Sequence, residues 1–299
     1  MRLTSVLSRR CRCSSALVNP FSTIPYRAMP SYAITGVSKG LGFEILSHLS
    51  TDPNNTVIGI VRDKSATEKT VSTKLSGRAN IHIIHGDLND YASLEKASAD
   101  TAAITGGSLD YLIANAGYVP QWDAYDPIGE LAEQPEKISE ELNKLYQTNI
   151  AGNIQLYRYF MPLILKGNVK KVVAISSGLA DLKSLNGLGL NNSPLYALVK
   201  AGLNVLTGKY SAQYKKDGVL FMNICPGMVD VGHFDNLEPK QAAAVKAMEA
   251  KFKAAIPGFP GPSKPDAAMK NVINIMEKAS FENGDAGAFL SSRGTKYGY

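Results

Sequence analysis

Short apolar runs rich in β-branched residues alternate with helix-patterned segments along most of this chain of 299 residues. The expected strands are Ser31–Thr35, Thr56–Val61, Ile81–His85, Leu109–Ala114, Lys171–Ser176, Val219–Ile224 and Gly287–Ser291. The expected helices are Gly40–Ser50, Tyr91–Ala103, Ile138–Leu165, Leu195–Tyr214, Pro239–Ala255 and Pro265–Lys278. Alternating strands and helices predict a parallel sheet covered on both faces, and continuous apolar runs are typical of such buried strands. We therefore expect an α/β fold, a single-domain Rossmann-type doubly wound parallel sheet.

This alternation is interrupted after Val231. The ten residues 256–265 contain four prolines, which excludes a helix or a central strand there. A segment hinged by proline and glycine beside the carboxyl edge of a sheet is typical of a substrate lid, which we place at about residues 232–265. The alternative is a surface excursion that packs on the domain without gating it.

Residues 1–28 differ from the rest of the chain in charge. They contain five arginines and no acidic residue, and the first acid is Glu44. An Arg-rich, Ser-rich and acid-free leader is typical of a mitochondrial transit peptide, which predicts a matrix location. The alternative is a disordered or untranslated extension with synthesis starting at Met29, which predicts a cytoplasmic protein; mass spectrometry of the native N-terminus decides between them. In either case the catalytic domain is expected to span residues 29–299.

Composition narrows the classes of function. The formal charge of the whole chain is +6, so removing the five leader arginines leaves +1, which argues against nucleic acid as a partner. Three cysteines without a CxxC pair exclude a disulfide framework, and the four histidines lack metal-ligand spacing, so we expect no metal. No apolar run approaches the ~20 residues that cross a bilayer, so we expect a soluble protein.

A glycine-rich turn follows the first expected strand and opens the first expected helix. Glycines there let the backbone approach a pyrophosphate, and the helix N-terminus offers free N–H groups and a partial positive charge. The strand before and the helix after are the context that a dinucleotide site requires. The candidate cofactor residues in this turn are Thr35, Gly36, Ser38, Lys39, Gly40, Leu41 and Gly42.

The second expected strand ends in Val61-Arg62, 20 residues past Gly42. An acid at this place would bind a ribose 2′-hydroxyl and favour NAD, whereas an arginine suits a 2′-phosphate. Lys39 adds a second cation near the same place, so the pair predicts NADPH (NADP+) as cofactor. Asp63 follows directly and argues weakly for NAD.

In order and spacing, the motifs of this chain resemble those of the short-chain dehydrogenase/reductase superfamily. The elements that carry the resemblance are Thr35–Gly42, Asp87, Asn115-Ala116-Gly117, Asn149, Ser177, Tyr196 with Lys200, and Pro226-Gly227. They cover about residues 31–231. The chain looks most similar to the carbonyl-reductase-like branch that includes sniffer-type and fungal ketoreductase members.

The catalytic candidates are Ser177, Tyr196, Lys200 and Asn149. Tyr196 and Lys200 are four residues apart, so a helix places them on one face. A phenol with a pKa of ~10 is a poor acid–base catalyst at neutral pH, and the nearby Lys200 ammonium, with the charge of the oxidised nicotinamide, would stabilise the phenolate and lower that pKa. Tyr196 would then protonate a carbonyl oxygen that Ser177 holds, with Ser176 as the alternative. The resemblance implies that Asn149 supports Lys200 through a water molecule.

The resemblance also implies contacts with the cofactor. Lys200 would bind the nicotinamide ribose, Asp87 the adenine, and Asn115 the region beside the adenine ribose. The remaining positions expected at the cofactor by the same resemblance are Leu88, Ala116, Gly117, Tyr196, Pro226, Gly227 and Val229.

Three features depart from the family pattern. The gap of 19 residues from Ser177 to Tyr196 is longer than usual, and we expect Leu185–Asn192 to form a loop at the mouth of the site. Val231 stands where the family often has a threonine that bonds the cofactor. The region after Val231 is longer than in the simplest members.

Aromatic and apolar residues beside the site predict an apolar pocket, which suits a small hydrophobic ketone or aldehyde. They are Phe234, Met248, Phe252, Ile256 and Phe259 in the lid, and Tyr118, Trp122 and Tyr125 after Gly117. The expected function is NADPH-dependent carbonyl reduction, with Tyr196 as proton donor. The alternatives are an NAD-dependent alcohol dehydrogenase and a non-catalytic NADP(H)-binding sensor or scaffold. The resemblance further implies a homodimer or tetramer formed through the helices at 138–165 and 195–214.

Overall fold

The structure is a computed structural model that describes residues 29–232, 235–256 and 258–297. The leader, on which the transit-peptide prediction depends, lies outside the described residues, and so does Phe234.

A seven-stranded sheet forms the centre of the molecule, and every strand pair is parallel. The strands are β1 (Ser31–Thr35), β2 (Thr56–Val61), β3 (Ile81–His85), β4 (Tyr111–Ala114), β5 (Lys171–Ile175), β6 (Leu220–Ile224) and β7 (Phe289–Leu290). Their order is β3-β2-β1-β4-β5-β6-β7, so the direction of winding reverses between β1 and β4. Ligands bind outside the carboxyl ends of parallel strands at such a switch point.

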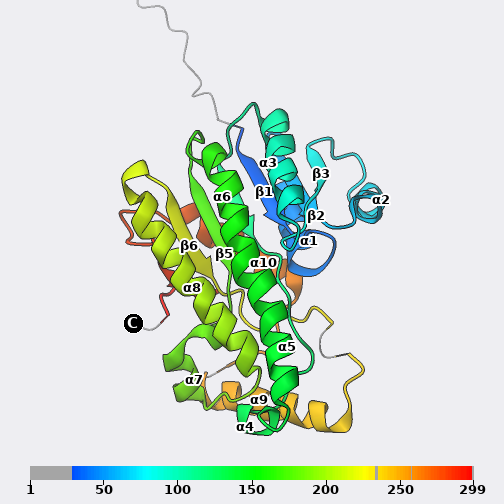
Figure 1. The fold of residues 1–299 in the computed structure, drawn as a ribbon, viewed down its shortest axis with the longest axis vertical. Coiled ribbons are helices and arrows are strands. Elements are labelled where there is room, and N and C mark those ends of the chain that lie inside the picture. Colours follow the sequence, from blue (N-terminus) through cyan, green and yellow to red (C-terminus); the bar gives the residue numbers. More distant parts are fainter. Residues whose placement is uncertain (1–28, 233–234, 257, 298–299) are drawn as a thin grey trace, which may run out of the picture.

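Helices cover both faces of this sheet (Figure 1). They are α1 (Gly40–Leu49), α2 (Lys64–Lys74), α3 (Tyr91–Thr105), α4 (Ile128–Leu131), α5 (Pro135–Tyr146), α6 (Gly152–Ile164), α7 (Leu182–Leu188), α8 (Pro194–Tyr214), α9 (Pro239–Ala255) and α10 (Pro265–Lys278). A π-helical segment, η1 (Gln147–Ala151), joins α5 to α6, and 3₁₀ turns follow β5 (Gly178–Ala180) and α8 (Lys215–Asp217). The predicted doubly wound α/β fold is confirmed.

Each face of the sheet has its own apolar core. On one face Ile45 and Leu46 of α1 and Met269 and Val272 of α10 pack on the strands. On the other face the core is formed by α3, α6 and α8, with Tyr157 and Phe160 of α6 completely buried. The helices bury both faces of the sheet. The polar side chains of the site therefore lie at the ends of the strands, where solvent reaches them.

Three helices were absent from the sequence prediction, namely α2, α4 and α7. Helix α2 buries only Thr67, so it lacks an apolar stripe; it begins because the Asp63 carboxylate accepts the Ala66 N–H at 2.9 Å. The expectation of a loop over Leu185–Asn192 is wrong for its first half, which belongs to α7. That helix is capped by Asp181 and ends at Gly189 in the left-handed conformation, with no buried residue between.

The long helix expected over Ile138–Leu165 is divided in the structure. The chain is helical from Pro135, and the five π-helical residues of η1 interrupt the α-helical pattern between α5 and α6. Apolar periodicity cannot reveal such a bulge, because it shifts the helix face by only one residue. Figure 1 shows α4, α7 and α9 gathered at one end of the molecule, beyond the sheet.

Among the helices of the described residues, none combines the length and the hydropathy that crossing a membrane requires.

Candidate active site

The site lies at the carboxyl ends of β1, β4, β5 and β6. Thr35 at the end of β1 binds the end of β4, since its Oγ1 accepts the N–H groups of Asn115 and Ala116 at 3.1 and 3.0 Å. In return the Asn115 side-chain amide donates to the Thr35 carbonyl oxygen at 2.9 Å. These hydrogen bonds hold the two strands together at the switch point, and the predicted residues Thr35, Asn115 and Ala116 therefore have a structural role here as well.

The glycine-rich turn begins at this junction, directly after Thr35. Gly36 and Gly40 have φ values of +76° and +59°, which favour glycine. A Cβ on Gly42 would overlap the Gly36 carbonyl oxygen, so the turn can close only with glycine there. No side chain caps the N-terminus of α1, whose N–H groups remain available to a phosphate. The turn thus fits a dinucleotide pyrophosphate on its geometry.

The two cations predicted to select NADPH are both exposed. Lys39 is the residue before α1, and Arg62 follows β2 directly. Asp63, the residue that argued for NAD, is engaged as the cap of α2. Its carboxylate therefore already has a partner within the chain, whereas the neighbouring strand end presents Arg62 to solvent.

The end of β3 supplies Asp87 and Leu88. The Asp87 carboxylate accepts the Asn89 N–H at 3.0 Å and so shapes its own turn. Leu88 is buried against α6, and a Cβ on Gly152 would lie 2.6 Å from the Leu88 carbonyl oxygen. The side chain of Leu88 thus packs inside the chain, Asp87 is half-buried, and the expectation that both contact the cofactor stays a prediction.

Two adjacent serines follow β5 and behave differently. Ser176 is buried and its hydroxyl donates to the Asn204 side chain on α8 at 2.7 Å. Ser177 is half-buried, and its Oγ accepts only the Leu179 N–H, at 3.2 Å. The Ser177 hydroxyl keeps its proton available for a ligand in the adjoining cavity, which favours Ser177 over Ser176 as the residue that holds a carbonyl oxygen.

Tyr196 and Lys200 lie on the first turns of α8, on the same face, as predicted. The Lys200 Nζ is 5.6 Å from the centre of the Tyr196 ring. Lys200 is buried, and its Nζ donates to the carbonyl oxygen of Ile175, the last residue of β5, at 2.8 Å. The Ile175 carbonyl therefore fixes the lysine between the helix and the sheet.

Burial dominates the acid–base properties of both residues. It lowers the pKa of Lys200 to about 8. It raises the pKa of the Tyr196 phenol, and the Asp123 carboxylate adds to this rise. Without cofactor the pKa of Tyr196 is therefore raised, because desolvation disfavours the phenolate. The expectation that Lys200, together with the charge of the oxidised nicotinamide, lowers this pKa stays a prediction.

Asn149 lies in the π-helical segment and is buried. Its side chain makes two hydrogen bonds with the backbone of Tyr118: Oδ1 accepts the N–H at 3.1 Å, and Nδ2 donates to the carbonyl oxygen at 2.9 Å. A Cβ on Gly117 would lie 2.5 Å from Asn149 Oδ1 and 3.9 Å from Lys200 Nζ. Gly117 therefore leaves the space through which Asn149 approaches Lys200.

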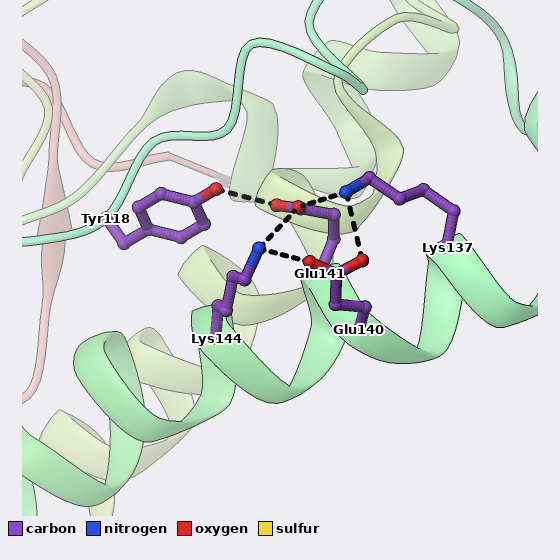
Figure 2. Close-up of polar contacts among 5 residues, drawn as sticks. All are labelled: Tyr118, Lys137, Glu140, Glu141 and Lys144. Atoms are coloured by element: carbon purple, nitrogen blue, oxygen red, sulfur yellow. Dashed lines mark hydrogen bonds and ion pairs between the residues drawn. The ribbon is translucent and has the colours of Figure 1, made fainter.

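Tyr118 is itself held by a charged cluster on α5 (Figure 2). Its hydroxyl donates to the buried Glu141 at 2.7 Å, and Lys137 and Lys144 pair with the same carboxylate at 3.3 and 3.1 Å. The two lysines and the tyrosine lower the pKa of Glu141 against the effect of its burial. The expectation that Tyr118 lines the substrate pocket is wrong, because its ring is turned towards α5.

A cavity of about 430 Å³ adjoins Ser177 and Tyr196. Its wall combines the segment after β4, the residues after β5 and β6, and α9, and it contains no Asp, Glu, Lys, Arg or His among the described residues. Of the predicted pocket residues, Tyr125, Met248, Phe252 and Ile256 line it. Trp122 packs instead on Leu145, Leu195 and Val199. Phe259 stacks on Phe252, with ring centres 5.3 Å apart, and lies behind the wall.

The residues after β6 form the side of the cavity near the glycine turn. Pro226, Gly227, Val229 and Val231 all line it. A Cβ on Gly40 would lie 4.0 Å from Val231 Cγ1, so Val231 faces the start of α1. At this position the family often has a threonine hydroxyl, and in this chain a methyl group of Val231 lies there instead.

The predicted lid is the segment that carries α9. Its two ends are joined by backbone hydrogen bonds, from Asp230 N to Ser263 O at 3.0 Å and from Ser263 N to Met228 O at 2.8 Å. Helix α9 itself has no buried residue. It is attached across the cavity by Lys240, whose Nζ lies 2.7 Å from Asp126, and by Lys251, which donates to the Gly189 carbonyl at 2.6 Å.

Three residues at the cavity or its border were missed from the sequence. Cys225 is buried, and its Sγ accepts the N–H groups of Gly178 and Gly227 at 3.1 and 3.3 Å. Tyr297, near the end of the chain, lines the cavity and hydrogen-bonds Cys225. Asp123 is buried below the N-terminus of α8. A cysteine before Pro226-Gly227 and an aspartate after Trp122 were visible signals; nothing in the sequence indicated Tyr297.

Glu44, His48 and Asp266 bring ligand-type atoms within 4.8 Å of one another on α1 and α10. Asp266 also pairs with Lys270 at 2.9 Å, and only three ligands are offered. The expectation that the protein works without a metal therefore stays a prediction.

Comparison with protein families matches residues 31–242 to the model of the short chain dehydrogenases. The chain is 52% identical over 268 residues to the short chain dehydrogenase virK of Hypocrea virens, an alignment that covers 90% of this chain and 99% of the relative. It is 48% identical over 269 residues to the short-chain dehydrogenase/reductase iacC of Pestalotiopsis fici, again over 90% and 99% of the two chains.

Solved structures share the fold. The NADPH-bound carbonyl reductase from chicken fatty liver superposes with a TM-score of 0.70 at 24% identity, over 90% of this chain and 98% of that one. The carbonyl reductase Sniffer of D. melanogaster gives a TM-score of 0.70 at 22% identity, over 91% and 100%.

Proposed function

The chain belongs to the short-chain dehydrogenase family, and from that premise we propose that it reduces an uncharged, apolar ketone or aldehyde to the alcohol with NADPH. The observation that carries the proposal is the cavity. The hydroxyls of Ser177 and Tyr196 open into a space of about 430 Å³ whose described wall bears no charged side chain. A carbonyl oxygen is the group that two neutral hydroxyl donors in an apolar space recognise.

NADPH would be held by the residues at the strand ends. The turn from Gly36 to Gly42 and the uncapped start of α1 would receive the pyrophosphate. Arg62 and Lys39 would bind the 2′-phosphate by charge, and Asp87 would contact the adenine. When bound, the cofactor supplies the hydride that reduces the carbonyl carbon.

The proton comes from the chain. Tyr196 donates its phenolic proton to the carbonyl oxygen, and Ser177 holds that oxygen by a second hydrogen bond. Lys200, fixed on the Ile175 carbonyl, stabilises the phenolate that the transfer leaves behind. Asn149, bound to the Tyr118 backbone, would support Lys200 through a water molecule.

Helix α9 acts in this proposal as a lid over an apolar substrate. Val245, Met248 and Phe252 face the cavity, while Lys240 and Lys251 attach the helix to the opposite rim. Since no residue of α9 is buried and its ion pairs lie at the surface, a modest free energy suffices to open it.

A screen of uncharged aromatic and aliphatic ketones and aldehydes, followed by NADPH oxidation with NADH in parallel, tests the function. We expect turnover of apolar carbonyls and little activity on carboxylated or phosphorylated analogues of the same size. Turnover confined to charged substrates would contradict the assignment.

The choice of NADPH over NADH depends on Arg62. Arg62→Ala should raise the KM for NADPH at least tenfold and leave that for NADH nearly unchanged, because a charge-assisted contact to the 2′-phosphate is lost. Arg158→Ala, an exposed position on α6, is the matched control. Equal effects of Arg62→Ala on the two cofactors would favour an NAD-dependent enzyme.

We also propose a homo-oligomer that buries α5 and α8. Leu198 and Val205, seven residues apart on α8, are 60% and 63% exposed, and Tyr146 of α5 is 51% exposed. Substituting Leu198 and Val205 by glutamate should convert the assembly to monomers in light scattering. A monomeric native protein would contradict this part of the proposal.

A further inference from the structure

The last described residues of the chain fold back along β7 and reach the substrate cavity. After β7 the chain turns at Ser291, whose N–H donates to the Thr295 carbonyl oxygen at 2.7 Å. The returning chain is antiparallel to β7, and the Tyr297 N–H donates to the Phe289 carbonyl oxygen at 2.9 Å. The rings of Tyr297 and Phe289 stack with their centres 4.4 Å apart. A strand of the central sheet therefore sets the direction of the Tyr297 side chain.

This returning segment packs on the loops that follow β5 and β6. A Cβ on Gly178, the residue after Ser177, would lie 3.2 Å from the Tyr297 hydroxyl oxygen and 3.7 Å from the ring carbon that bears it. A Cβ on Gly227, after β6, would lie 3.2 Å from Ser292 Oγ. Glycine at both positions thus leaves room for the residues after β7 to approach the two loops closely.

The Tyr297 hydroxyl is held in place by the Cys225 thiol. It donates to Cys225 Sγ, which also accepts the N–H groups of Gly178 and Gly227 at 3.1 and 3.3 Å. The sulfur is buried and joins both loops to the tyrosine. All four residues line the cavity. They form one wall of it, directly beside Ser177.

A second wall of the cavity is built differently. Val245, Met248 and Phe252 of α9 line it, and no residue of that helix is buried. A carbonyl compound has two substituents on its reacting carbon. If Ser177 holds the oxygen, a substituent on the side of Ser177's neighbour Gly178 meets a ring fixed on the sheet, whereas the other can extend along the more loosely attached α9.

We propose that Tyr297 is a specificity-determining residue: its ring limits one substituent of the reacting carbonyl to a hydrogen atom or a small alkyl group. The substrate is then an aldehyde, or a ketone with one small substituent. This inference rests on the proposed function, whose substrate class it narrows. It gives Tyr297 no part in hydride or proton transfer. A single methylene in an apolar pocket changes kcat/KM by a factor of about 10 to 200, so one fixed ring suffices for this selection.

A series of phenyl ketones tests the ring. The phenyl group is kept while the second substituent grows from methyl through ethyl and propyl to isopropyl, and kcat/KM is measured with NADPH on the full-length protein. In wild type we expect kcat/KM to fall at least tenfold from the methyl to the isopropyl ketone. Tyr297→Ala should raise the isopropyl-to-methyl ratio at least tenfold, because the ring is gone. An unchanged ratio in Tyr297→Ala would overturn the proposal, and so would a wild type that reduces both ketones equally well.

Tyr297→Phe is the matched control. It keeps the ring and its stacking on Phe289 and loses only the hydroxyl, so the ratio should stay within about twofold of wild type. Phe252→Ala opens the wall on α9 instead. It should weaken the binding of every ketone in the series without restoring the isopropyl compound. An equal gain for that compound in Phe252→Ala would show that Tyr297 has no special place in the selection, and would overturn the proposal.

Alkylation of Cys225 tests the position of the ring without a substrate. With Cys11 and Cys13 replaced by serine, Cys225 is the only thiol of the chain, and mass spectrometry follows its reaction with uncharged iodoacetamide in the absence of cofactor. Tyr297→Ala and Tyr297→Phe both lose the hydrogen bond to the sulfur, and only Tyr297→Ala also loses the ring. We therefore expect Tyr297→Ala to react at least ten times faster than Tyr297→Phe. Equal rates would overturn the proposal.

Tyr297→Leu replaces Tyr297→Ala in both experiments if the alanine variant does not fold, since leucine is smaller than tyrosine and still packs on Phe289. The two readouts also separate the two levels of inference. Failure of the proposed function would appear as no turnover of any ketone in wild type, with the difference in Cys225 alkylation still measurable. Failure of the present inference would appear as an active wild type whose ketone preference and Cys225 reactivity do not depend on the ring of Tyr297.

Discussion

The site has two parts that are built in opposite ways: residues 31–117, where we propose that the cofactor binds (the cofactor side), and residues 178–262, where we propose that the substrate binds (the substrate side). On the cofactor side four parallel strands end together, and side chains such as Thr35 and Asn115 bind one strand end to the next. On the substrate side two short helices and α9 enclose a cavity, and α9 buries none of its residues. Paired strands and hydrogen bonds between their ends hold the first side together, whereas a few surface contacts attach α9 on the second.

This difference follows from what each side has to bind. A pyrophosphate binds to backbone N–H groups at a fixed turn, so a rigid strand-end cradle would suit the cofactor. An apolar substrate lacks such groups and would be enclosed by apolar side chains, so its side of the site can be held more loosely. We expect substitutions on the cofactor side to affect folding, and those on the substrate side to affect KM with little change in stability.

Gly42→Ala should have the largest effect on stability. The new Cβ would overlap the Gly36 carbonyl oxygen and lie 2.5 Å from the Asn115 side chain, so the turn must shift. We expect a loss of about 3 kcal/mol or more in the free energy of unfolding, measured by urea denaturation, and loss of NADPH binding.

Gly208→Ala on α8 is its matched control. A Cβ there meets no atom within 4 Å, so helix propensity alone acts and should stabilise the protein by up to ~1 kcal/mol. Similar losses from both substitutions would mean that the glycine turn is no more tightly packed than the open position of Gly208 on α8.

Lys200→Met tests whether Lys200, which lies between the cofactor side and the substrate side, is desolvated in the folded protein. Burial lowers the pKa of Lys200 to about 8, below its ordinary value of 10.5. Between pH 8 and 10 the unfolded chain therefore binds more protons at this residue, and wild type should gain stability relative to Lys200→Met as pH rises, by at most ~1.4 kcal/mol per unit. Urea midpoints of both proteins across this range measure it; a constant difference would show that Lys200 is not desolvated.

Phe252→Ala should act on the substrate side alone. It removes an apolar ring from the cavity wall and its stacking on Phe259. We expect the KM for an apolar ketone to rise about tenfold, with the dissociation constant of NADPH unchanged. Phe281→Ala, outside the cavity wall, is the control. A comparable loss of NADPH affinity in Phe252→Ala would break the separation of the two sides.

Lys240→Ala should have the smallest effect. It removes the ion pairs with Asp126 and Glu130, at 2.7 and 2.8 Å, that attach α9 to the far rim. Exposed pairs contribute about 0–1 kcal/mol, so stability should barely change, while the KM for substrate should rise by a factor of about two to five. Lys246→Ala on the same helix should change neither. Since salt screens such pairs, the effect of Lys240→Ala should shrink at high ionic strength.

The sequence predicted the strands of the cofactor side well, whereas its assignment of cofactor-binding residues there stays a prediction. The strand boundaries 31–35, 56–61 and 81–85 agree with the structure, since continuous apolar runs indicate buried strands. Thr35 and Asn115 lie where the motif suggested. Their mutual hydrogen bonds could not be foreseen, because they join residues 80 positions apart.

Prediction was weaker on the substrate side for physical reasons. Helix α7 has capping residues at its ends and no buried stripe, so hydrophobic periodicity gave no signal. Tyr118 and Trp122 were expected in the pocket from composition, but their direction depends on contacts with α5 and α8. Asp123 acts through backbone N–H groups 72 and 73 residues away, a contact that only the fold creates.

The central claim, that Tyr196 supplies the proton for carbonyl reduction beside the apolar cavity, is tested most directly by Tyr196→Phe. The ring is retained and only the hydroxyl is lost, so the fold and the affinity for NADPH should stay as in wild type. We expect the rate of NADPH oxidation with an apolar ketone to fall by a factor of about 10² to 10⁴. A Tyr196→Phe protein that binds NADPH and reduces the ketone at the wild-type rate would contradict the account.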